Sequence, residues 1–237
     1  MLRLSLPPFC EGRRVSHEDI QDLASATYSI DTPLVINVGD VMYDYLLYSL
    51  PHATGHSGIL EELKLKQRGY YLATVHRASN TDCPNRLQGI LHALNELAEY
   101  RARVVFLVHP RTKKALSNLT NSVIHPNVHL LDPVSYYEML SLERYARLIL
   151  TDSGGVQKEA FLLGVRCVTL REETEWHETV NAGWNILAGT DPNRILDAVA
   201  RLEDSRLGQA SPEIYGDGRA VEYIVQVLMR WATCYLP

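Results

Sequence analysis

Short apolar runs alternate with longer amphipathic stretches along most of the chain. Six runs rich in β-branched residues are almost continuous in apolar character, which is typical of parallel strands covered on both faces. They lie at residues 34–38, 70–75, 104–108, 128–131, 148–151 and 167–170. The pattern therefore predicts a buried parallel sheet.

Helical spacing of apolar residues fills the intervals between these runs. Residues 84–101 place leucine, isoleucine and alanine on one face, and Pro84 stands in the first turn, where its missing N–H would have no helical partner. Further helices are expected at 136–144, 156–163, 191–202 and 219–231. This βαβα order predicts an α/β fold, a Rossmann-like parallel sheet with helices on both faces. Its ligand crevice would lie beyond the carboxyl ends of the strands.

The N-terminal region has a weaker pattern. Residues 1–32 are expected to form an irregular or helical segment, with at most a marginal helix at 17–27, whereas residues 33–237 are expected to form one domain that ends in a helix. A loop is expected at 203–212. His52 and His56 have metal-ligand spacing, but Pro51 and Gly55 indicate a loop and no third ligand is near, so no metal site is predicted.

Composition narrows the class of protein. The 237 residues are 46% hydrophobic and 22% charged, which excludes a disordered or fibrous chain. The net charge of −5 and the lack of a basic block argue against nucleic acid as a partner. No apolar run approaches the roughly 20 residues of a membrane span. Four scattered cysteines and an N-terminus without a signal-peptide pattern favour a reducing, cytoplasmic location.

One strand runs directly into a glycine pair and a helix. Gly154 and Gly155 allow a tight turn and close approach of a ligand, and the free N–H groups at a helix start favour an anion such as pyrophosphate. Ser153 adds a hydroxyl, and Glu159 could accept hydrogen bonds from a ribose diol. The alternative is that Asp152 or Ser153 is only an N-cap and Glu159 is solvated. The local motif alone favours neither the anion site nor this alternative.

Polar residues also follow other strands. His76 is placed to donate to a phosphate or approach a base, and Arg77 offers a fork for an anion. His109 and Arg111 follow the next strand, while Arg171, beside several glutamates, is expected to contact an anion at a strand end. Glu172, Glu173 and Glu178 are expected to be solvated rather than catalytic. Structural histidines are the alternative, but several polar strand ends at one edge predict a shared crevice.

Neither a Walker A loop nor a Gly-x-Gly-x-x-Gly motif occurs, which argues against ATP hydrolysis and dinucleotide redox chemistry. Six other motifs, in order, resemble those of the non-hydrolysing UDP-N-acetylglucosamine 2-epimerases. They are VGDVMYD (38–44), TVHRASN (74–80), TDSGGVQKE (151–159), LREETEW (170–176), AGTDP (188–192) and YGDGRA (215–220). The resemblance covers about residues 34–228. It implies a two-domain GT-B fold, of which this chain resembles the C-terminal, nucleotide-holding half.

The family inverts C2 of a UDP-amino sugar for polysaccharide synthesis by eliminating UDP and adding it back, without a cofactor. By matching motif, the UDP of the substrate would be held by His76, Met139, Ser153, Gly154, Gly155, Glu159 and Arg171. The family's acids and bases lie on its N-terminal domain, so the catalytic residues stay unknown. A separate N-terminal domain becomes an expected partner, and a homodimer is a second partner that the resemblance raises.

Two departures keep the function open. Ser79 replaces the glutamate of the usual His-Arg-x-Glu-Asn motif, where Arg77 and His109 would contribute to an allosteric site for a second UDP-sugar. Trp176 replaces an arginine that could contact the phosphates, a form resembling a branch that includes epimerases of diacetamido uronic acid sugars. The sugar is therefore open. A non-catalytic UDP-sugar-binding remnant and the nucleotide half of a GT-B glycosyltransferase are the alternative interpretations.

Overall fold

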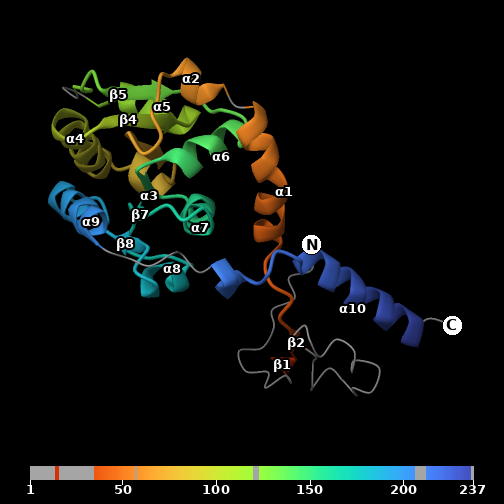
Figure 1. The fold of residues 1–237 in the computed structure, drawn as a ribbon. Helices are drawn as coiled ribbons and strands as arrows, with labels where there is room; N and C mark the ends of the chain where they lie inside the picture. Colours follow the sequence, from red (N-terminus) through yellow and green to blue (C-terminus); the bar gives the residue numbers. More distant parts are fainter. Residues whose placement is uncertain (1–13, 16–34, 57, 120–122, 206–211, 236–237) are drawn as a thin grey trace. The chain divides into compact units, whose positions relative to one another are not determined.

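The computed structural model describes residues 14–15, 35–56, 58–119, 123–205 and 212–235 (Figure 1). The chain forms two compact units. One consists of residues 48–212, and the other joins residues up to 47 with those from 213 onward. The predicted helix at 17–27 and the predicted boundary at 32 and 33 lie outside the described residues.

A six-stranded parallel sheet forms the centre of the unit 48–212. Its strands are β3 (Tyr70–Val75), β4 (Arg103–Val108), β5 (Val128–Leu131), β6 (Leu148–Thr151), β7 (Cys167–Thr169) and β8 (Asn185–Leu187). They are arranged in the order β5-β4-β3-β6-β7-β8. The order reverses between β3 and β6, and such a switch point is where open α/β sheets bind their ligands.

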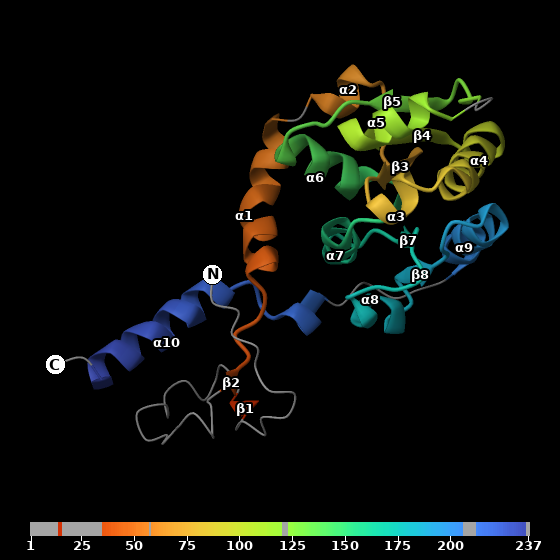
Figure 2. The same cartoon turned by 180° about the vertical axis from the view of Figure 1, so that it is seen from behind.

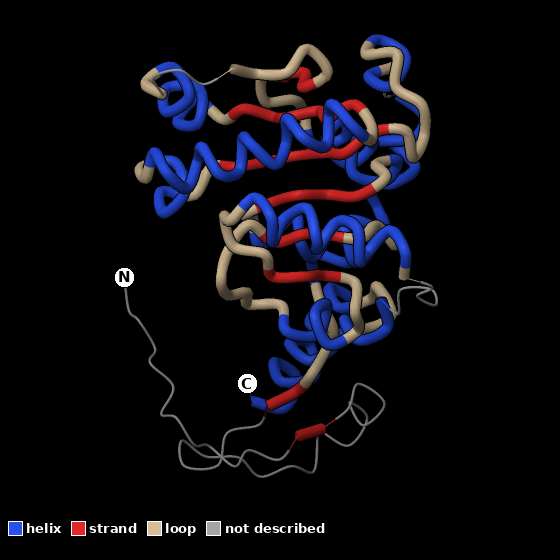
Figure 3. The backbone as a smooth tube through the Cα atoms, turned by 90° about the vertical axis from the view of Figure 1, so that its left-hand side faces the viewer, coloured by secondary structure: helices blue, strands red, loops and turns tan. Residues whose placement is uncertain are grey.

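Helices cover both faces of this sheet, so the predicted Rossmann-like α/β class is confirmed (Figures 2 and 3). One face carries α4 (Pro84–Tyr100), α5 (Pro110–Ser117) and α9 (Pro192–Asp204). The other carries α2 (Ile59–Glu62), α6 (Tyr136–Tyr145) and α7 (Gly154–Leu162). Two short helices, α3 (Ala78–Thr81) and α8 (His177–Asn181), follow β3 and β7. Alternate residues of β3, β4 and β6 enter opposite clusters, which explains their continuous apolar runs.

Two predicted segments differ from the structure near the N-terminal side. The strand expected at 34–38 is only β2 (Val35–Ile36), which pairs with β1 (Arg14–Val15) outside the six-stranded sheet. The loop expected around Pro51 is instead part of α1 (Val41–His56). Pro51 lacks the N–H for a helical bond, yet the helix continues through it. Ala53 is buried, and the Ser141 hydroxyl donates to its carbonyl at 2.9 Å.

The second unit brings together two sequence motifs that lie far apart in the chain. Gly39 and Gly216 both have positive φ angles, 89° and 100°. A Cβ on Gly216 would lie 2.9 Å from the Cα of Gly39, so the close approach requires glycine. A 3₁₀ helix (Pro212–Tyr215) precedes this contact and α10 (Ala220–Tyr235) follows it. The Asp44 carboxylate accepts the first N–H groups of α10, from Ala220 at 3.1 Å and Val221 at 2.7 Å.

Two findings bear on membranes and metals. Across the described ranges, every helix is too short or too polar to cross a membrane. Within the same ranges, no three His, Cys, Asp or Glu side chains are grouped so that they could hold a metal ion.

Candidate functional site

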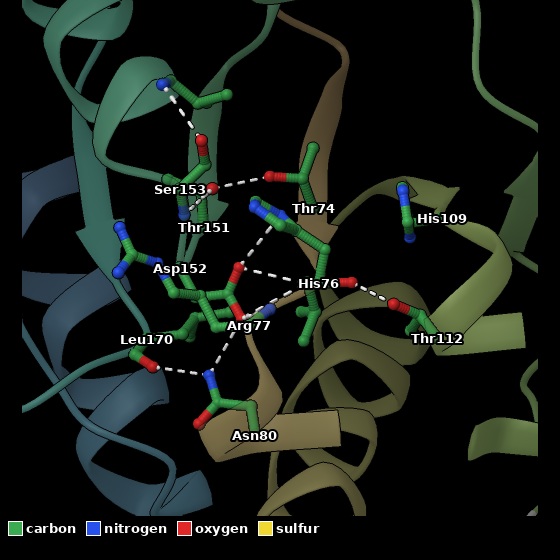
Figure 4. Close-up of polar contacts among 12 residues, drawn as sticks. Thr74, His76, Arg77, Asn80, His109, Thr112, Thr151, Asp152, Ser153 and Leu170 are labelled. Atoms are coloured by element: carbon green, nitrogen blue, oxygen red, sulfur yellow. Dashed lines mark hydrogen bonds and ion pairs between the residues drawn. The ribbon is translucent and has the colours of Figure 1, made fainter. Parts of the chain in front are cut away.

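Asp152 organises the turn that follows β3, at the switch point of the sheet (Figure 4). Its carboxylate is fully buried and accepts hydrogen bonds from the backbone N–H groups of His76 and Arg77, both at 3.0 Å. The side-chain amide of Asn80 donates to the same carboxylate at 3.0 Å. The His76 ring is also held, since its Nδ1 lies 3.3 Å from Asp152. The sequence does not indicate this role, because the position of Asp152 before the glycine pair is typical of a helix cap.

A pair of threonines joins β3 to β6 at the same edge. Thr74 and Thr151 are register partners, and their hydroxyl oxygens are 2.5 Å apart. The Thr151 hydroxyl also accepts the N–H of Ser153 at 2.9 Å. Ser153 in turn is the N-cap of α7, where its Oγ accepts the N–H of Val156 at 3.5 Å. These contacts fix the start of α7 directly beside the end of β3.

The start of α7 is suited to an anion. Among the described residues, nothing accepts the backbone N–H groups of Gly154 and Gly155, and the first turn of the helix contains no acidic residue. A Cβ on Gly154 would lie 3.3 Å from a carboxylate oxygen of Glu175 and 3.4 Å from the indole nitrogen of Trp176. Glycine therefore lets the loop after β7 approach the helix closely.

That loop carries Arg171, which is mostly buried. Its two terminal nitrogens donate to Glu175 at 2.9 and 3.0 Å. These bonds hold the pKa of the Glu175 carboxyl down at about 2. Arg77 approaches the same carboxylate at 3.6 Å. The structure thus brings Arg77 and Arg171 together at the start of α7.

Trp176 and Lys158 support the loop from the other side. The Trp176 indole N–H donates to the carbonyl of Gly154 at 2.6 Å. The ammonium of Lys158 lies 4.2 Å from the centre of the Trp176 ring, within the range of a cation–π contact. An aromatic residue at position 176 therefore packs the loop onto α7.

Buried amides and hydroxyls anchor the loop from beneath. The Thr174 hydroxyl donates to the Gln157 side-chain carbonyl at 2.6 Å and accepts the N–H of Trp176 at 3.1 Å. Asn185 accepts from the Thr169 hydroxyl at 2.7 Å and donates toward Gln157 at 3.4 Å. The residues of this network lie on different elements and do not form a sequence motif, so the sequence alone did not predict it.

A cavity of about 370 Å³ opens on the other side of His76. It is lined by Thr74, Val75, His76, Leu107, His109, Pro133, Val134 and Met139. The rings of His76 and His109 are 6.2 Å apart there. Arg111 does not join them, because its guanidinium pairs with Asp82 at 2.5 Å and both residues line a separate pocket.

Glu159 is only 7% exposed, so the interpretation of a solvated glutamate is wrong. The Tyr136 hydroxyl donates to it at 3.0 Å. The fully buried carboxyl of Glu143 is its neighbour. Burial raises the pKa of both carboxyls, and for Glu143 the nearby Glu159 raises it further.

The sequence contained a signal for Glu143. It lies three residues after Leu140 and four after Met139, on the face of α6 that packs against the sheet. An acidic residue on an apolar helix face is a candidate for a perturbed pKa. Glu172, Glu173 and Glu178, by contrast, are exposed as expected.

Comparisons with known proteins agree on one family. A family model described as UDP-N-acetylglucosamine 2-epimerase matches residues 26–229. A UDP-N-acetylglucosamine 2-epimerase homolog from Methanococcus maripaludis is 44% identical over 198 residues, which are 82% of this chain and 54% of the relative. A UDP-2,3-diacetamido-2,3-dideoxy-D-glucuronate 2-epimerase from Pseudomonas aeruginosa is 40% identical over 211 residues, 89% of this chain and 57% of the relative.

A solved structure gives the same result for the fold. The crystal structure of Methanocaldococcus jannaschii UDP-GlcNAc 2-epimerase in complex with UDP-GlcNAc and UDP matches with a TM-score of 0.74 and 35% identity. The match covers 85% of this chain and 56% of that one. The chain therefore spans about half the length of the curated relatives that it matches.

Proposed function

The chain belongs to the UDP-N-acetylglucosamine 2-epimerase family, and from that premise we propose that it is the nucleotide-holding half of an enzyme that inverts C2 of a UDP-amino sugar. Its fold matches just over half of a solved UDP-GlcNAc 2-epimerase, which supports its assignment as the C-terminal half of a GT-B fold. The observation that carries the proposal is the anion-receiving start of α7, located at the switch point of the sheet and beside the cavity next to His76.

The parts of UDP fit different parts of this site. The diphosphate would lie on Ser153, Gly154 and Gly155, where the helix dipole and free N–H groups favour negative charge. Arg171 adds a guanidinium fork at the same place. The cavity lined by His76 and Met139 is of a size and polarity to take the uracil ring.

Glu159 fits the ribose. It lies in α7, one turn after the glycines, and its carboxylate is held by Tyr136. A carboxylate in that position can accept hydrogen bonds from both hydroxyls of a ribose diol, the role that acidic residues take in other nucleotide-binding folds.

In the proposed reaction, the C1–O bond to UDP breaks as the C2 proton leaves, and UDP then adds back while a proton returns on the opposite face of C2. The groups of this chain would stabilise the charge that develops on the departing diphosphate, a contribution larger in the transition state than in the ground state. We propose that the acids and bases at C2 and C3 come from an N-terminal half, as part of a longer chain or as a separate subunit. One relative is named as a UDP-2,3-diacetamido-2,3-dideoxy-D-glucuronate 2-epimerase and the similar solved structure contains UDP-GlcNAc, so UDP-GlcNAc and a UDP-diacetamido uronic acid are both candidate substrates.

Thermal melting with UDP tests the nucleotide site. UDP at about 100 times its Kd should stabilise the chain by roughly 2.7 kcal/mol, which is about 5–10 °C for a chain of this size. Ser153→Ala and Glu159→Ala should lose much of this shift, while Ser117→Ala, an exposed serine of α5, should keep it. A cooperative transition without any UDP-dependent shift would contradict the proposal.

A separate assay tests the activity. The chain is combined with the N-terminal half of a relative, and the conversion of UDP-GlcNAc and of the diacetamido uronic acid sugar is followed. Epimerisation at C2 is expected with one of them. Release of UDP only in the presence of a sugar acceptor would indicate a glycosyltransferase instead.

A further inference from the structure

Positive groups converge on one carboxylate at the start of α7. Glu175 receives two parallel hydrogen bonds from Arg171, at 2.9 and 3.0 Å, and lies 3.6 Å from a terminal nitrogen of Arg77. Its Oε2 would be 3.3 Å from a Cβ on Gly154, the first residue of the helix. A single negative charge therefore faces both guanidinium groups and the positive end of the helix dipole.

This place coincides with the one proposed for the diphosphate. The same Arg171 and the same helix start would have to receive the phosphate oxygens, and two anions cannot share them without strong repulsion. The low pKa of Glu175, about 2, means that its carboxylate is ionised at neutral pH. It is a permanent competitor for the site.

The residues on either side of Glu175 are anchored by contacts that do not involve the Glu175 side chain. Thr174 and Trp176 are held by Gln157 and by the carbonyl of Gly154. The Glu175 carboxylate is half exposed, it pairs with Arg171 and Arg77, and the backbone of Glu175 itself also donates to it. A rotation about its χ angles would release both arginines while the loop stays anchored.

We propose that Glu175 is a built-in counter-anion, which occupies the diphosphate position in the ligand-free molecule and swings aside when the diphosphate of UDP arrives. This inference rests on the proposed nucleotide site and deepens it. Without a ligand, the carboxylate keeps Arg77 and Arg171 in place despite their mutual repulsion. With a ligand, its displacement cancels part of the attraction, so Glu175 weakens UDP binding and makes UDP easier to release.

Calorimetric titration of the full chain with UDP and with inorganic pyrophosphate tests the counter-anion. Glu175→Gln keeps the size of the side chain and removes its charge, so both ligands should bind about fivefold more tightly. Glu175→Asp shortens the side chain by one methylene and should bind UDP with an intermediate Kd. The matched control is Glu172→Gln in the same loop, where the carboxylate pairs with Arg194 at 3.2 Å, away from α7. Its Kd should equal that of the wild-type chain.

The outcomes separate the two proposals. Suppose that the wild-type chain binds UDP and that a folded Glu175→Gln binds it equally or more weakly. The proposal that Glu175 is a counter-anion would then be wrong, while the proposed nucleotide site would stand. Weaker binding would mean that Glu175 orients Arg171 for the ligand. Binding by Glu175→Gln alone would support both proposals, and lack of binding by every variant would overturn both. Should Glu175→Gln fail to fold by circular dichroism, the direction of the change in Glu175→Asp decides.

Discussion

The side-chain amide of Asn80 donates to the buried carboxylate of Asp152, with 3.0 Å between Nδ2 and Oδ2. The same nitrogen donates to the carbonyl of Leu170, also at 3.0 Å. Asn80, which lies in the short helix that follows β3, therefore connects the end of β6 to the end of β7. These strand ends form the edge of the proposed ligand crevice. Through Asp152, Asn80 therefore helps to position His76 and Arg77.

Replacing Asn80 by alanine should lower the free energy of unfolding by about 1–3 kcal/mol, because two buried acceptors then lose a donor. UDP binding should also weaken, since Asp152 orients His76 and Arg77. Urea unfolding and UDP titration measure the two effects. The control is Ser79→Ala, at an exposed neighbouring position. Equal urea midpoints for the two variants would show that the Asn80 bonds contribute nothing to stability.

Asp44→Ala should destabilise α10, because its carboxylate caps the first two N–H groups of that helix. Loss of such a cap costs about 0.5–2 kcal/mol. Hydrogen exchange of the amides in α10 should speed up accordingly. Asp44→Asn retains one of the two oxygen acceptors and should keep part of the protection, so identical exchange in both variants would argue against capping by this side chain.

The elements that the sequence predicted correctly are those whose pattern is set by local burial. β3 and β6 are covered on both faces, so every residue of each strand is buried and the apolar run is continuous. The long helix α4 shows a clear apolar stripe because only one of its faces meets the sheet. The strand β8 was missed, because it has only three residues and begins with Asn185, a buried amide.

The site was predictable only in part, for a related reason. Parallel topology brings residues that follow strands to one edge, so His76, Ser153 and Arg171 could be located from the sequence. The roles of Asp152 and Asn80 depend on a hydrogen bond between residues 72 positions apart. The pairing of Arg171 with Glu175 is local, but the position of both over Gly154 depends on how the loop after β7 folds back onto α7.

Thr174→Val should loosen the loop that carries Arg171 and Glu175. Valine keeps the shape of threonine but removes the shorter hydrogen bond to the buried Gln157 carbonyl, at 2.6 Å, and leaves the one from Asn185 at 3.4 Å, which should cost about 0.5–1.5 kcal/mol. Urea unfolding gives the loss of stability, and UDP titration should show weaker binding. The control is Thr190→Val, a half-buried threonine in another loop. If both variants bind UDP alike, the loop does not need this anchor.

The buried pair of Glu143 and Glu159 should make stability fall as pH rises. Both pKa values are raised above 4.5, so above that pH the folded state binds more protons than the unfolded state, and stability present in acid is lost as the carboxyls ionise. Glu143→Gln removes one titrating group, and its free energy of unfolding should fall less between pH 5 and 8, by up to about 1.4 kcal/mol per pH unit. Urea unfolding across this range measures how steeply the free energy of unfolding changes with pH.

Glu138→Gln is the control on the same helix. Hydrogen bonds from Ser135 lower the pKa of Glu138, so the titration of Glu138 affects stability only below pH 4.5. If the free energy of unfolding of Glu143→Gln falls with pH as steeply as that of the wild-type chain, the burial of the two carboxyls does not cause the pH dependence.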